Sequence, residues 1–167
     1  AGMGGIGKTL LASEFAHRYR DHFPGGVFWI GMAQPDQVAG QVAACAGPDG
    51  LNLPGWERLD YDARIAAVRR AWQEPAARLL VFDNLEDGEL VAAWRPHGGG
   101  ARVLITTRSG VWPALLGVRP LPLPPLTRTE GARLLLTPRA QRLRRDVEAL
   151  LADAATRAAA EAITEAV

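Results

Sequence analysis

The chain has 167 residues, of which 48% are apolar, and a net charge of +1. This size supports one globular core rather than two, and a charge so near zero neither indicates nor excludes a polyanionic partner. The single cysteine, Cys45, cannot form an internal disulfide. No stretch approaches the ~20 continuous apolar residues of a membrane span. We therefore expect a cytoplasmic protein that does not contact a membrane.

A glycine-rich loop comes first in chain order. Residues 2–9 read GMGGIGKT, a full G-x-x-x-x-G-K-T pattern, and Lys8 within it is the only lysine among 19 basic residues. Glycines permit the positive φ angles that turn successive N–H groups toward phosphate oxygens, an ammonium suits the β- and γ-phosphates, and the Thr9 hydroxyl suits Mg²⁺. The loop therefore predicts a phosphate site, with a flexible turn before a helix as the alternative.

Helical and strand patterns alternate in the first half of the chain. Residues 8–22 place Leu11, Phe15 and Tyr19 at one helical spacing, which predicts a buried face. The other elements that we expect in this half are a strand at 27–31 and helices at 34–46 and 58–72.

The second half continues the same alternation. Its expected strands are at 78–83, 102–107 and 119–123, and its expected helices are at 86–94 and 129–136, followed by alanine-rich helix formers from residue 139 onward. Strands that alternate with helices are typical of a parallel sheet covered by helices, so the predicted fold class is α/β.

Two polar residues follow the apolar strands of the second half. Asp83 ends the run RLLVFD, and Arg108 comes directly after RVLITT. At the carboxyl edge of a parallel sheet, an acid can hold Mg²⁺ together with Thr9, and an arginine can reach a γ-phosphate. The alternatives are an aspartate that caps the next helix and an arginine that lies on the surface.

Other charged residues indicate no further site. His17, His22 and His97 share no metal-ligand spacing. The arginines at 139–145 are followed by acidic residues, which favours a solvated helix face over direct contact with nucleic acid.

Five ordered segments, GMGGIGKT, FPGGVFWI, LLVFDNLED, RVLITTR and PLPPLTRTEGARLLL, together resemble the NB-ARC domain of bacterial STAND-class P-loop NTPases. The resemblance covers about residues 1–137. It implies the three-layer P-loop NTPase sandwich, whose parallel sheet has the strand order 2-3-4-1-5. Because strand 1 of that order would precede Gly2, we expect the order 2-3-4-[1 missing]-5, followed by C-terminal helices.

The same resemblance implies roles for individual residues. Lys8, Asp83, Asn84 and Arg108 take the catalytic positions, with Asp83 as the Walker B acid and Arg108 as the sensor arginine, while Thr9 and Asp83 hold Mg²⁺. The residues expected to contact ATP or ADP are Gly2, Met3, Gly4, Gly5, Ile6, Gly7, Lys8, Thr9 and Leu10. The amide of Asn84 stands where a second carboxylate is often found and cannot serve as a general base, so we expect slow ATP hydrolysis.

The implied organisation is a nucleotide-binding core at 1–137 and the helical start of a second subdomain at 138–167, including a helix at 158–167. A Gly-Leu-Pro-Leu segment that follows this helix in the family is not in the chain. Family members act as ADP/ATP switches, which implies self-association of the full-length protein and sensor and effector modules outside this segment. A metabolic P-loop kinase and a degenerate scaffold that binds nothing are the alternative functions.

Overall fold

In the computed structural model, which describes residues 1–165, three strands form one parallel sheet in the order β1-β2-β3. They are β1 (Val27–Gly31), β2 (Arg78–Asp83) and β3 (Ala101–Ile105). Gly31 pairs with Asp83, and Phe82 pairs with Ile105, so the carboxyl ends of the strands share one edge of the sheet. The first three predicted strands and their neighbour relations are confirmed.

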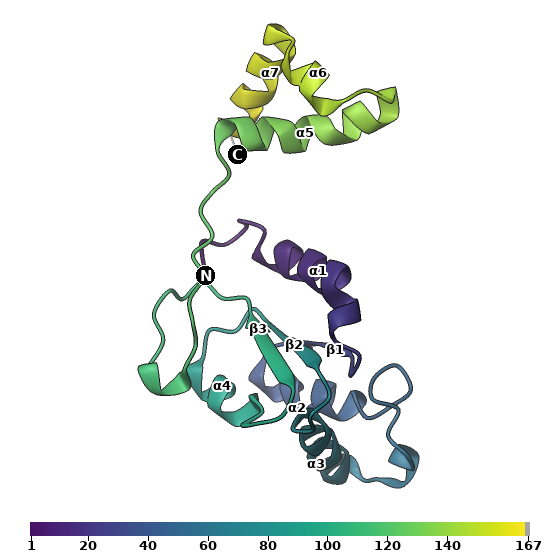
Figure 1. Cartoon of the computed structure of the whole chain (residues 1–167). Helices are drawn as coiled ribbons and strands as arrows, with labels where there is room; N and C mark the ends of the chain where they lie inside the picture. The colour runs from purple at the N-terminus through teal and green to yellow at the C-terminus, as the bar shows by residue number, and fades with distance from the viewer. Residues whose placement is uncertain (166–167) are drawn as a thin grey trace. The chain divides into compact units, whose positions relative to one another are not determined.

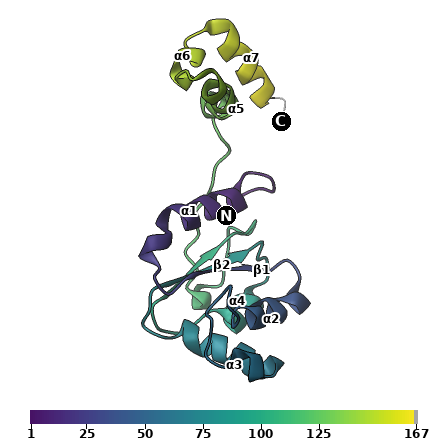
Figure 2. The ribbon, with the colours of Figure 1, turned by 90° about the vertical axis from the view of Figure 1, so that its right-hand side faces the viewer.

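Helices cover both faces of this sheet, with α1 on one face and α2, α3 and α4 on the other (Figures 1 and 2). The helices of this part of the chain are α1 (Lys8–Tyr19), α2 (Pro35–Ala44), α3 (Tyr61–Trp72) and α4 (Gly88–Trp94), and the short 3₁₀ helices are η1 (Arg20–His22), η2 (Trp56–Arg58) and η3 (Ala114–Leu116). All four predicted helices are therefore present. Helix α2 begins one residue later than predicted. Helices α3 and α4 begin two or three residues later, because Asp60 caps α3 and Asp87 caps α4 through their side chains.

The alternation of side chains along β2 builds two cores. Leu80 and Phe82 belong to the larger core, which lies toward α2, α3 and α4, whereas Leu79 and Val81 pack with Ala12 of α1. Every residue from Arg78 to Phe82 is buried, because helices cover the strand on both faces. This double burial explains why the strand reads as one continuous apolar run.

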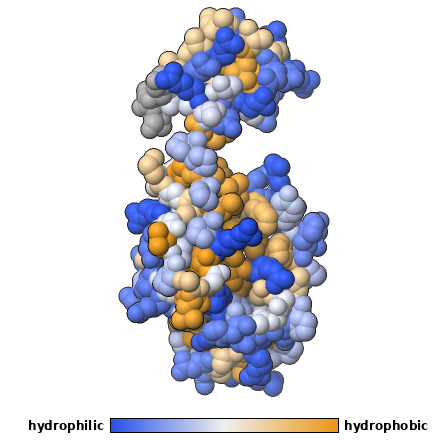
Figure 3. Space-filling model, turned by 60° about the vertical axis from the view of Figure 1, so that its left-hand side comes forward, coloured by the Kyte–Doolittle hydropathy of each residue, from blue (hydrophilic) through white to orange (hydrophobic). Residues whose placement is uncertain are grey.

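One face of α1 corrects a prediction. Leu11, Phe15 and Tyr19 are 51%, 38% and 46% exposed, so the expectation that they form a buried face is wrong. The described helix instead buries Ala12, whose small side chain lets α1 approach β2 closely. Leu11 and Phe15 border an apolar groove that also includes Leu104 of β3, and apolar side chains gather on the surface of this unit (Figure 3).

A second correction concerns residues 119–123, which were expected to form a strand and do not. The backbone N–H of Leu123 donates to the carbonyl of Ala1 at 2.9 Å, and the amino group of Ala1 donates to the carbonyl of Leu121 at 2.8 Å. A strand requires a continuous ladder, and in the part of the chain that the structure describes only Ala1 pairs with this segment. The sheet is therefore three-stranded rather than the expected four-stranded remnant.

The chain divides into two compact units, Ala1–Leu123 and the residues from Pro124 onward. The second unit consists of α5 (Arg128–Leu143), α6 (Val147–Leu151) and α7 (Ala154–Glu165). Its core residues are Ala132, Leu136, Ala140, Leu150, Leu151 and Ala160. None of the helices described in residues 1–165 is long and apolar enough to cross a membrane.

Helix α5 begins with a capping box, in which the side chain of Thr127 and that of Glu130 each bond to the other's backbone N–H. It continues past the predicted end at residue 136 and through Pro138. Packing of residues on both sides of this proline outweighs its usual cost of ~3 kcal/mol. The predicted domain boundary at 137/138 falls inside α5 and stays a prediction, and the last two residues of the predicted helix at 158–167 lie outside the described residues.

Candidate functional site

The glycine-rich loop leads into the N-terminus of α1. Gly5 and Gly7 have φ angles of 77° and 92°, which side-chain-bearing residues rarely adopt. A Cβ built at either position would meet no heavy atom within 4 Å, so the space beside them is open. Because Gly7 is the N-cap of α1, the unpaired N–H groups of the first helical turn and the positive end of the helix dipole lie beside this opening.

The ammonium of Lys8 folds back onto the loop. Its Nζ donates to the carbonyl oxygens of Gly2 at 2.8 Å and of Met3 at 2.6 Å. These two bonds use two of the three N–H donors of the ammonium. The positive charge is thus already held at the loop, on the first turn of α1.

Asp83, the last residue of β2, joins the loop to the sheet edge. Its Oδ1 accepts hydrogen bonds from the hydroxyls of Thr9 at 2.8 Å and Thr106 at 2.5 Å. The Thr9 bond spans 74 positions of sequence. Thr9 and Asp83, which the sequence assigned to one cation, therefore lie in direct contact.

The donor set fits Mg²⁺. The lone pairs of the Thr9 hydroxyl and the other carboxylate oxygen of Asp83 are hard oxygen donors. Within residues 1–165, no group of three or more His, Cys, Asp or Glu could hold a metal ion. A magnesium ion here would therefore take its remaining ligands from phosphate and water, which is the usual arrangement for this cation.

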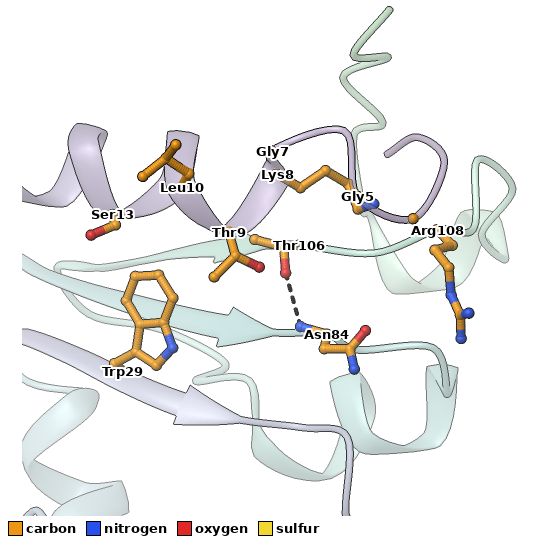
Figure 4. A pocket seen from close by; sticks show the side chains of 11 residues that line it. Gly5, Gly7, Lys8, Thr9, Leu10, Ser13, Trp29, Asn84, Thr106 and Arg108 are labelled. Carbon is orange, nitrogen blue, oxygen red and sulfur yellow. Dashed lines mark hydrogen bonds between the residues drawn. The ribbon is translucent and has the colours of Figure 1, made fainter. Parts of the chain in front are cut away.

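Asn84 follows Asp83 in the left-handed region, with a φ of 57°. Its backbone N–H donates to Oγ1 of Thr106 at 2.8 Å (Figure 4). The side chain of Asn84 lines the same cavity as the loop. The structure therefore places an amide rather than a carboxylate beside the cavity.

Arg108 is paired with Glu86, a residue for which the sequence indicated only a place in a helix. The backbone N–H and the Nε of Arg108 both donate to Oε1 of Glu86, at 3.0 and 3.1 Å. Burial on its own would raise the pKa of Glu86, but the hydrogen bonds and positive charge of Arg108, with a hydrogen bond from Ser109, outweigh it and lower the pKa. The pair therefore stays ionised at neutral pH.

These elements enclose an open cavity of about 720 Å³ (Figure 4). The residues that line it are Gly4, Gly5, Gly7, Lys8, Thr9, Leu10, Ser13, Trp29, Asn84, Thr106 and Arg108. Its volume lies within the range of small-molecule sites.

Most residues that the sequence singled out come together at this cavity. Asp83 contacts it through Thr9 and Thr106, whereas Gly2, Met3 and Ile6 belong to the loop but do not line it. The sequence did not single out Ser13, Trp29, Thr106 or Glu86 as site residues. Only Thr106 carried a local signal, because a polar residue directly follows an apolar strand that ends at the same sheet edge as Asp83.

The chain is similar to a known protein family and to known proteins. Residues 1–112 match the NB-ARC domain family. The chain is 31% identical over 115 residues to the regulatory protein AfsR of Streptomyces griseus and to that of Streptomyces coelicolor. It is 30% identical over 127 residues to a nucleotide-binding leucine-rich repeat (NLR)-like protein of Hyaloscypha variabilis.

Each of these matches covers 65% of the chain, but only 11% of the AfsR proteins and 12% of the NLR-like protein. No solved structure matches the chain significantly.

Proposed function

Because the chain belongs to the NB-ARC domain family of nucleotide-binding proteins, we propose that it binds ADP or ATP with Mg²⁺ and acts as the nucleotide switch of a signalling or transcription-regulating protein. The observation that carries this proposal is the contact of Thr9 with Asp83 beneath an open glycine loop. In this arrangement, the parts needed to hold a phosphate chain and its cation lie in one place.

The loop and α1 would supply the phosphate-binding groups. Gly4, Gly5 and Gly7 border space that no side chain fills, and the Lys8 ammonium lies on the same loop. A bound phosphate would compete with the carbonyls of Gly2 and Met3 for that ammonium. Mg²⁺ neutralises phosphate charge when bound, and Thr9 and Asp83 are the residues that would hold it.

Hydrolysis should be slow, because the described residues that line the cavity include no carboxylate or histidine that could act as a general base. Asn84 stands beside Asp83 with an amide that cannot accept a proton from water. The nearby acid Glu86 is committed to two hydrogen bonds from Arg108. A long-lived nucleotide state suits a switch better than it suits a metabolic phosphotransferase.

Two similar proteins support a regulatory role, since both Streptomyces relatives are described as regulatory proteins. The chain corresponds to a small share of each, so the sensing and output steps are properties of the full-length protein. We propose that nucleotide exchange controls self-association of that protein in the cytoplasm.

Titration calorimetry on the full-length protein tests the proposal, with ADP and ATP each titrated in Mg²⁺ and in EDTA. Native protein should bind both nucleotides, more tightly with Mg²⁺. Lys8→Ala removes a charge-assisted contact and should weaken binding about 10- to 100-fold. Arg20→Ala, which removes a cation from η1 at the far end of the first helical segment, is the matched control and should bind as native protein does.

Three results would contradict the proposal: no Mg²⁺-dependent uptake of either nucleotide, equal binding by the Lys8→Ala variant, or turnover of many ATP molecules per second. Phosphorylation of a small acceptor would support the kinase alternative instead.

A further inference from the structure

Thr106, which directly follows β3, forms hydrogen bonds with four consecutive residues, 82–85, at the end of β2 and in the loop after it. Its N–H donates to the carbonyl of Phe82 at 3.0 Å, and its carbonyl accepts from the N–H of Leu85 at 2.9 Å. Its hydroxyl bonds to Asp83 at 2.5 Å and to the N–H of Asn84 at 2.8 Å. The residue is only 5% exposed.

The direction of the two hydroxyl bonds follows from their partners. The N–H of Asn84 can only donate, so Oγ1 of Thr106 accepts from it, and the single hydroxyl proton is left for Asp83. An ionised carboxylate can only accept, so the chain of bonds Asn84 to Thr106 to Asp83 has one possible polarity. The bond to the carboxylate is charge-assisted and therefore among the stronger hydrogen bonds.

Oδ1 of Asp83 thus receives two hydroxyl protons, one from Thr106 and one from Thr9. Two donors on the same oxygen fix the rotation of the carboxylate and leave its other oxygen for a ligand. Thr106 is well suited to this task, because β-branching restricts its χ1 and burial excludes competing water.

We propose that Thr106 is a positioning residue for the cation site. Its hydroxyl holds the Asp83 carboxylate against Thr9, so that the two proposed magnesium ligands are preorganised before nucleotide binds. This inference rests on the proposed function, and it assigns a role to a residue that acts through Asp83.

The neighbouring Thr107 provides a matched control. It is buried to the same degree, at 4% exposed, but its hydroxyl accepts from the N–H of Ser109 at 3.0 Å within its own turn. Replacing either threonine by valine keeps the volume and removes a buried hydroxyl. Only the change at Thr106 removes a hydrogen bond to Asp83.

The experiment measures ADP binding to the full-length protein by calorimetry, once in Mg²⁺ and once in EDTA, and reports the ratio of the two dissociation constants. Thr106→Val should raise Kd in Mg²⁺ about 10-fold and leave Kd in EDTA nearly unchanged. Thr106→Ser keeps a hydroxyl and should recover most of the native ratio. Thr107→Val should retain the native ratio.

A merely structural role predicts a different pattern, in which Thr106→Val and Thr107→Val weaken binding equally with and without Mg²⁺. That pattern would overturn the inference. So would a Thr106→Val variant whose ratio of dissociation constants in Mg²⁺ and EDTA equals that of native protein. Thr106→Cys, compared with Thr106→Ser, makes the same test if the valine variant does not fold, because a thiol is a weak donor of similar size. Native protein that shows no Mg²⁺ effect would overturn the proposed function as well, and so distinguishes the two failures.

Discussion

Replacing Glu86 by glutamine should tighten the binding of ATP without changing that of ADP. Glu86 accepts two hydrogen bonds from Arg108, and the guanidinium that it engages lines the candidate nucleotide cavity. Under the proposed function, a γ-phosphate must share Arg108 with this carboxylate. Glutamine keeps a side-chain oxygen that can accept the same bonds, but it removes the competing negative charge.

The magnitude follows from the exposure of the pair. The side chains of Arg108 and Glu86 are 65% and 36% exposed, with an N–O distance of 3.1 Å. Ion pairs this exposed contribute about 0.2–1 kcal/mol. If ATP no longer has to weaken this ion pair when it binds, the Kd for ATP should fall by up to about 5-fold. Because salt screens exposed charges, the gain should shrink at high ionic strength.

The assay is calorimetry of ATP and ADP binding to native protein and to Glu86→Gln, at low and high salt. Glu89→Gln is the control, since Glu89 is an exposed acid three residues away in the first turn of α4. Competition between Glu86 and the γ-phosphate would be excluded if the Glu86→Gln variant bound ATP more weakly than native protein, or if the Kd for ADP fell by the same factor.

Further predictions concern stability and reactivity. In the folded state the pKa of Glu86 is lowered from 4.5. The ionised carboxylate therefore stabilises the fold fully above about pH 4.5, and this stabilisation is lost as the pH falls below that value. The difference in the free energy of unfolding between native protein and the Glu86→Gln variant should therefore shrink in acid. Burial raises the pKa of Cys45 to about 11, so iodoacetamide at pH 8 should modify it about 100-fold more slowly in folded than in denatured protein. Gly7→Ala should cost about 1–2 kcal/mol in chemical denaturation because φ is 92° there, whereas Gly4→Ala, in equally open space, should cost less. Phe82→Ala removes a fully buried ring and should lower the free energy of unfolding by about 3–5 kcal/mol.

Local patterns predicted the elements that carry the site. The predicted strand at 78–83 matches β2 at both ends. A strand that is buried on both faces has consecutive apolar residues, and these are visible in the sequence. The loop before α1 was predicted from glycines whose backbone angles few other residues adopt. Asp83 was placed beside Thr9 from the rule that the carboxyl ends of parallel strands share an edge.

Contacts between distant residues were harder to predict. Arg108 was expected near the cavity. Its partner Glu86 lies 22 positions away in the sequence. No local pattern distinguishes Glu86 from an ordinary acidic residue of a helix. The spacing of Leu11, Phe15 and Tyr19 predicted that they share one face of a helix. Helical periodicity does not show whether another element covers that face, and in the structure all three side chains are exposed. The segment at 119–123 has strand-like composition and lacks a strand, because a ladder needs a partner along its whole length.

The glycine-rich loop, the alternation of strands with helices and the family of the chain could all be read from the amino-acid sequence, because each depends on residue type and local spacing. Only the tertiary structure decided that Thr106 holds Asp83, that Glu86 engages Arg108 and that Ala12 rather than Leu11 is buried. These three outcomes depend on the register of the sheet and on how closely α1 approaches it, which are set by packing between residues far apart in the chain.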